Sequence, residues 1–117
     1  MPQKVLLDNC TPAPVGRFLI DCPVATAARL GWERLKNGLL LSRAEQDGFT
    51  VLVTCDQSMQ HQENLSGRKI ALVVLETNDL SLLRLYREEI ARLVRDAKPG
   101  GYYTLPVDYR KAKLEKT

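Results

Sequence analysis

The chain has 117 residues, of which 44% are hydrophobic and 26% charged, and its formal net charge is +3. This length predicts one domain with a single core, and apolar runs such as residues 70–75 are far too short to span a bilayer. Residues 106–117 carry four basic and two acidic side chains (+2), which leaves +1 for the rest of the chain. This balance argues against the strongly basic face of a protein that holds duplex DNA by its phosphates.

Two further features concern the compartment. The first residues, MPQKVLLD, show no signal-peptide pattern. The cysteines Cys10, Cys22 and Cys55 are odd in number and form no CxxC pair, which argues against a disulfide framework or a zinc site. We therefore expect a cytoplasmic protein in a reducing environment.

The predicted elements alternate between strands and helices. Strands are expected at residues 4–7, 24–26, 50–54, 70–75 and 102–105, the last at an edge of the sheet. A first helix should begin at Pro12 with Thr11 as its cap and end at Cys22 and Pro23. Asn37 should cap a second helix that ends at residue 46, and residues 80–97 should form the longest one. Residues 27–35 are ambiguous, and residues 57–68 read as a polar loop with room for one helical turn.

This alternation predicts βαβ units and a mostly parallel sheet with helices on both faces. Right-handed crossovers then bring the carboxyl ends of the strands to one edge of the sheet. Asp8 directly follows the first strand and Asp56 follows the strand at 50–54, so both carboxylates should lie at that edge. Asn37 should lie at the opposite end unless the segment before it folds back.

Two interpretations of these carboxylates stay open. Paired carboxylates beside amide oxygens suit a hard cation such as Mg²⁺, which can activate water and stabilise a phosphoryl group. Alternatively, Asp8 and Asp56 only cap the loops that they begin. Thr54 either orients Asp56 through its hydroxyl or satisfies an amide at the end of the strand.

Three other side chains are candidates for a functional role. His61 has no partner at a recognisable spacing and reads as a polar loop residue, and Cys55 should turn toward the core as an inert thiol. Trp32 is either a packed aromatic or an exposed stacking platform. A phosphorylatable receiver domain is excluded because Lys98 follows a long helix, whereas in such domains the lysine leaves the end of a strand.

The segments VLLDNCTP, VATAARLGWERLKNGLLL and GFTVLVTCDQSMQHQENLSGRKIALVVL resemble bacterial PIN-like proteins of unassigned function. The resemblance covers residues 4–105, and its most specific parts are LLDN, GWxxLKNG, LVTxDQ and QxNLxGR. It implies a three-layer α/β/α fold with a mostly parallel central sheet and a PIN-like domain at residues 1–105. It also implies acidic residues that bind Mg²⁺ or Mn²⁺. The basic segment at 106–117, which lies outside the resemblance, is expected to be a flexible tail.

Carried over by position, Asp8 matches the acid after the first strand and Asp56 the acid of the TxD motif, with Thr54 as its usual neighbour. Asn37 stands where relatives place a carboxylate in a D-x-x-I-L-x-x-A pattern, and Leu39 is apolar where a further acid could stand. Asp8, Asp56 and Asn37 are thus the expected metal ligands. Asn9, Thr54 and Gln57 are expected as supporting residues.

The resemblance implies a divalent-metal-dependent ribonuclease acting on RNA, with Asp8 and Asp56 as its catalytic residues, and such ribonucleases include the toxins of toxin–antitoxin pairs. An antitoxin protein and a second copy of the chain are the other partners that it implies. Two formal charges in place of three or four should weaken metal binding. The alternative is a weakly active or inactive PIN-like module that binds a protein or RNA partner.

Overall fold

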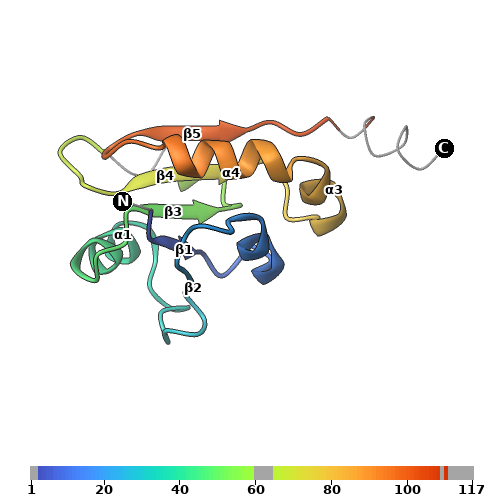
Figure 1. The fold of residues 1–117 in the computed structure, drawn as a ribbon. Helices are drawn as coiled ribbons and strands as arrows, with labels where there is room; N and C mark the ends of the chain where they lie inside the picture. The colour runs from blue at the N-terminus through green and yellow to red at the C-terminus, as the bar shows by residue number, and fades with distance from the viewer. Residues whose placement is uncertain (1–2, 60–64, 109, 111–117) are drawn as a thin grey trace.

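The computed structural model describes residues 3–59, 65–108 and 110 (Figure 1). His61 and most of the predicted tail therefore lie outside the described residues. Within the described part, five strands form one sheet, and each predicted strand is confirmed to within one residue at its ends. The strands are β1 (Val5–Leu7), β2 (Val24–Thr26), β3 (Val51–Thr54), β4 (Ala71–Leu75) and β5 (Tyr102–Leu105).

All neighbouring strands are parallel, and their order in the sheet is β2-β1-β3-β4-β5. The chain runs from β1 to the edge strand β2, crosses back past β1 to β3, and then continues outward to β4 and to β5 at the other edge. In open parallel sheets, ligands bind at the carboxyl ends of the two strands where the order reverses. Here those strands are β1 and β3.

The sheet is buried on both faces, as the uniformly apolar strands predict. Every residue of β1, β3 and β4 is buried, and alternate residues enter two separate cores. One face packs against η1 (Ala13–Phe18), α3 (Leu80–Leu85) and α4 (Arg87–Asp96), which is seen alongside the sheet in Figure 1. The other face packs against α1 (Asn37–Gln46) through Leu40, Leu41 and Ala44. The predicted three-layer α/β/α arrangement is thus confirmed.

The first helix differs from its prediction. It is a 3-10 helix whose capping residue is Pro12, and the Thr11 hydroxyl instead donates to the carbonyl of Val53 at 3.2 Å. Pro14 and Gly16 both lower helix propensity. Gly16 also lies against the edge strand, where an added Cβ would come within 3.1 Å of Val24 Cγ1. Thr11 thus ties η1 to β3 and does not cap it.

The long helix predicted at residues 80–97 is interrupted. Tyr86, with φ −110° and ψ 16°, leaves helical geometry and separates α3 from α4. The Tyr86 hydroxyl accepts the backbone N–H of Asp108 at 2.8 Å. The residue at the interruption therefore contacts the segment that follows β5. Asp79 caps α3, because its carboxylate accepts the N–H groups of Ser81 and Leu82.

The structure also tests two predictions about residues near α1. The sequence predicts that Asn37 caps this helix, but the capping residue is Lys36, and Asn37 is the first residue inside the helix. Trp32 is packed, with 8% of its surface exposed, and its ring meets Phe49 edge to face with 6.0 Å between centroids. The interpretation of Trp32 as an exposed stacking platform is therefore wrong. Among the residues described, no helix is long and apolar enough to cross a bilayer.

Candidate functional site

The carboxyl ends of β1 and β3 bring the two predicted acids to the same edge of the sheet. The backbone N–H of Asp8 donates to the carbonyl of Val53 at 2.9 Å, which extends the ladder one residue past β1. Thr54 is the last residue of β3, and Asp56 follows two residues later. Both acids thus lie where the order of the strands reverses.

The Thr54 hydroxyl joins the two acidic residues. It donates to Asp8 Oδ2 at 2.8 Å and accepts the backbone N–H of Asp56 at 3.0 Å. Thr54 has no exposed surface, and both hydrogen bonds are partly buried. Of the two roles predicted for Thr54, the satisfied amide is observed. The carboxylate that its hydroxyl holds belongs to Asp8.

The other hydrogen bonds of the carboxylates are local. Asp8 Oδ1 accepts the N–H of Asn9 at 2.7 Å. Asp56 Oδ1 accepts the N–H of Ser58 at 3.0 Å and its hydroxyl at 2.6 Å, a turn typical of aspartate at the start of a loop. Asp56 Oδ2 accepts no hydrogen bond from any residue that the structure describes. Asp56 thus caps its loop with one oxygen and keeps the other available.

Two thiols adjoin the acids. Cys10 is exposed, and its sulfur lies 3.4 Å from Thr54 Oγ1 and 3.8 Å from Asp8 Oδ2. The backbone N–H of Cys55 donates to this sulfur at 3.3 Å. Cys55 packs against the core as predicted, although it is only half-buried, and its thiol donates to the carbonyl of Thr77 at 3.1 Å.

The thiols shift the pKa of one another in opposite directions. The Cys55 thiol, helped by the Thr54 hydroxyl and the Cys55 backbone N–H, lowers the pKa of Cys10 from 9.0 to about 6. Burial and the charge of Asp8 oppose this shift. The neighbouring Cys10 sulfur, together with burial, raises the pKa of Cys55. Cys10 is therefore the thiol of the pair that ionises first. Sequence reasoning missed Cys10, whose only signal was its place two residues after Asp8.

The other predicted residues are placed as follows. Asn9 is exposed beside Asp8, and the amide of Gln57 donates to the carbonyl of Glu76 at 3.1 Å, in the loop after β4. The side chain of Asn37 lies outside the described part. Figure 1 shows α1 beside the end of the sheet at which β3 begins. The structure thus unites Asp8, Thr54 and Asp56, and Asn37 as a third ligand stays a prediction.

The donor set at this edge is compatible with one type of metal binding. Mg²⁺ keeps several waters and is commonly held by one or two carboxylates plus the phosphates of a substrate. Asp8 and Asp56 supply two carboxylates, and Asp56 Oδ2 is available. Among the described residues, no three acidic, histidine or cysteine side chains gather as a metal-binding group. The residues therefore fit a largely hydrated ion and do not fit one enclosed by protein ligands.

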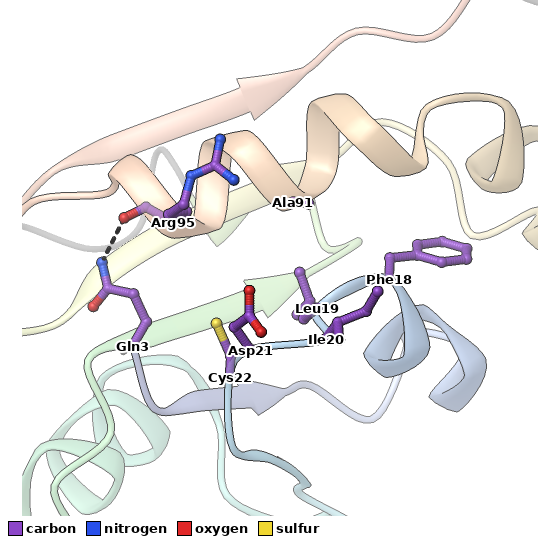
Figure 2. A pocket seen from close by; sticks show the side chains of 8 residues that line it. All are labelled: Gln3, Phe18, Leu19, Ile20, Asp21, Cys22, Ala91 and Arg95. Carbon is purple, nitrogen blue, oxygen red and sulfur yellow. Dashed lines mark hydrogen bonds between the residues drawn. The ribbon is translucent and has the colours of Figure 1, made fainter. Parts of the chain in front are cut away.

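A separate cavity of about 330 Å³ lies between α4 and the chain after η1 (Figure 2). Its lining is mainly apolar, with Asp21, Gln3 and Arg95 as polar members. Figure 2 shows the Gln3 amide reaching the Arg95 carbonyl, and the same amide donates to the carbonyl of Ala97 at 2.7 Å. None of the predicted site residues lines this cavity. Its lining is scattered over three parts of the sequence, so no local motif indicated it.

Comparisons with family models, with curated proteins and with solved structures found no match to this chain.

Proposed function

We propose that this chain is a divalent-metal-dependent ribonuclease of PIN-like type, with Asp8 and Asp56 as its metal-binding carboxylates. The observation that carries the proposal is the Thr54 hydroxyl, which contacts the carboxylate of Asp8 and the backbone of Asp56 at the point where the strand order reverses. A buried hydroxyl that fixes two acids relative to one another is typical of a preorganised site. The resemblance of the sequence to PIN-like proteins supplies the reaction and the RNA substrate.

The residues of the chain would divide the work as follows. Thr54 and the N–H of Asn9 hold the Asp8 carboxylate in one orientation. Ser58 anchors Oδ1 of Asp56, which leaves Oδ2 available for a ligand. When bound, Mg²⁺ or Mn²⁺ supplies a water of lowered pKa and stabilises charge on the phosphodiester. Because the described residues supply only two carboxylates at this edge, the phosphate of the RNA would complete the binding site.

A second candidate is a module that binds a protein partner, such as an antitoxin, and has little or no catalysis. The observation that favours it is Leu39 on α1, which is apolar and 69% exposed where the resemblance to PIN-like proteins leaves room for a further acid. An exposed apolar side chain can be removed from water by burial against another protein. The turn that Asp56 forms with Ser58 would then be its only role.

RNA cleavage separates the two candidates. A labelled single-stranded RNA would be incubated with the full chain in Mn²⁺ or in chelator, for wild type, Asp8→Asn, Asp56→Asn and Asp21→Asn. Loss of an outer partner of a metal ligand already costs about 10- to 100-fold, so each site variant should slow Mn²⁺-dependent cleavage by about 100-fold. The exposed Asp21, which lines the separate cavity, is the matched control and should change nothing.

Binding of the metal gives an independent measurement. An ion that binds only the folded chain stabilises it by mass action, so Mn²⁺ should raise the melting temperature of wild type. The Asp8→Asn/Asp56→Asn double variant should show no such rise. Cleavage that persists in chelator, or an equal rise in the double variant, would contradict the proposal. Absence of both cleavage and metal binding would favour the protein-binding module.

A further inference from the structure

The exposed Cys10 and the half-buried Cys55 lie next to each other although they belong to loops that follow different strands. The Cys10 sulfur is held against the backbone of residue 55 by the Cys55 N–H at 3.3 Å and lies 3.4 Å from Thr54 Oγ1. The Cys10 sulfur thus contacts the backbone nitrogen of Cys55. Within Cys55, only Cα and Cβ lie between that nitrogen and the Cys55 sulfur. The Cys55 sulfur lies 3.8 Å from Oγ1 of Thr11, the residue that follows Cys10.

We propose that Cys10 and Cys55 form an oxidation site at which a peroxide converts the two thiols into a disulfide that links the ends of β1 and β3. In the first step, the Cys10 sulfur attacks one oxygen of the peroxide and the O–O bond breaks. With hydrogen peroxide, this gives a sulfenic acid on Cys10 and water. In the second step, the Cys55 sulfur attacks the Cys10 sulfur and the S–O bond breaks. The oxygen of the sulfenic acid leaves as a second molecule of water. Overall, two thiols are oxidised to one disulfide and one peroxide is reduced to two waters.

The different exposure of the two thiols assigns their order. Cys10 is exposed and can meet an oxidant from solution, whereas Cys55 packs against the core and reaches chiefly its neighbours. Oxidation-sensitive cysteines are commonly accessible and lie beside a second cysteine that resolves the sulfenic acid. The turn at residues 8–11 is closed by one backbone hydrogen bond, from the N–H of Thr11 to the carbonyl of Asp8. Closing the disulfide requires this turn to move until the two sulfurs reach a bonding distance of about 2.0 Å.

Cys22 provides an internal comparison. It precedes Pro23, whose carbonyl accepts the N–H of Val5 at the start of β1, so it lies at the opposite end of the strand from Cys10. It lines the separate cavity with Asp21 (Figure 2). A disulfide that used Cys22 would require the fold to open. Oxidation of the folded chain should therefore leave Cys22 as a free thiol.

The oxidation site does not depend on the proposed nuclease activity, but it would change the carboxylate site. The Cys10 sulfur contacts both Thr54 Oγ1 and Asp8 Oδ2, and a bond to Cys55 would draw it away from them. That the disulfide alters RNA cleavage rests on the proposed function. The chemistry at the two sulfurs stands without it.

The test is a thiol map of the oxidised protein. The reduced full chain would be treated with hydrogen peroxide, alkylated under denaturing conditions, digested without reductant and analysed by mass spectrometry. We expect a peptide in which Cys10 and Cys55 are linked and a Cys22 peptide that is alkylated. A linked peptide that contains Cys22, links between separate chains as the main product, or three alkylated cysteines would overturn the proposal.

Three single variants test the order of the steps. Cys55→Ser should stop the reaction at a sulfenic acid on Cys10, which dimedone traps, and Cys10→Ser should leave Cys55 alkylated. Cys22→Ser is the matched control and should give the same yield of linked peptide as wild type. Absence of dimedone on Cys10 in Cys55→Ser would contradict the assignment of Cys10 as the first thiol oxidised.

Discussion

Replacing Thr54 by valine tests whether its hydroxyl holds the candidate site together. Valine has nearly the same shape but removes the donor to Asp8 and the acceptor of the Asp56 N–H. A hydrogen bond to a charged group contributes about 1.5–3 kcal/mol, and the partly shielded N–H adds the penalty of a lost partner. We therefore expect Thr54→Val to lower the free energy of unfolding by about 2–4 kcal/mol.

Thr54→Ser is the matched control, because serine keeps the hydroxyl and loses one fully buried methyl group. Loss of that group should lower the free energy of unfolding by only about 1 kcal/mol. Valine should therefore be worse than serine if the hydroxyl matters more than packing. Urea denaturation of each variant measures both values, since a domain of this size has enough stability for the variants to stay folded.

A double-mutant cycle of Thr54→Val with Asp8→Ala isolates the bond between the two side chains. We expect a coupling energy of about 1.5–3 kcal/mol, the range for a hydrogen bond to a carboxylate. A coupling below about 0.5 kcal/mol lies within the additivity of independent sites and would refute the reasoning. A serine variant less stable than the valine variant would refute it as well.

Two further predictions concern other positions. Asn37→Asp should tighten Mn²⁺ binding by adding a carboxylate if Asn37 belongs to the site, and without metal it should cost stability because like charges would face one another. Melting curves in chelator and in Mn²⁺ should then shift in opposite directions, and a silent variant in both would remove Asn37 from the site. Asp79→Ala should lower the free energy of unfolding by about 1 kcal/mol, because the carboxylate that caps α3 is lost. Urea denaturation measures this value, and Asp79→Asn, which keeps a capping oxygen, should stay close to wild type.

Much of the fold could be predicted because the strands carry their own signal. Residues 70–75 and 50–54 are short, continuously apolar runs bounded by polar residues, and both form strands buried on two faces. The interruption at Tyr86 could not be predicted, because the apolar stripe of Leu83, Tyr86, Ile90 and Val94 continues through it without a change of period. Its hydroxyl contacts Asp108, a residue far along the chain, which no local pattern encodes.

The site was predicted in part for a similar reason. The position of Asp8 and Asp56 at neighbouring strand ends follows from the alternation of strands and helices, and the structure places both there. Which carboxylate the Thr54 hydroxyl would meet depended on the register of β1 against β3, which pairs Leu7 with Val53. The same register sets Cys10 beside Cys55. Sequence spacing alone indicated neither contact.

The order of the strands also bears on how the chain folds. The paired residues of β1 and β3 are 46 positions apart in sequence, as Val5 and Val51 show. The other neighbouring strands are closer: 19 positions for β1 and β2, 20 for β3 and β4, and 30 for β4 and β5. Contacts between distant parts of a chain form slowly, because the closure entropy must be overcome before the contact rewards it. We therefore expect the pairing of β1 with β3 to form most slowly of these four. Asp8 and Cys10 meet Thr54 and Cys55 only through this pairing, so a chain whose carboxyl-terminal strands have already assembled still lacks both sites until β1 docks.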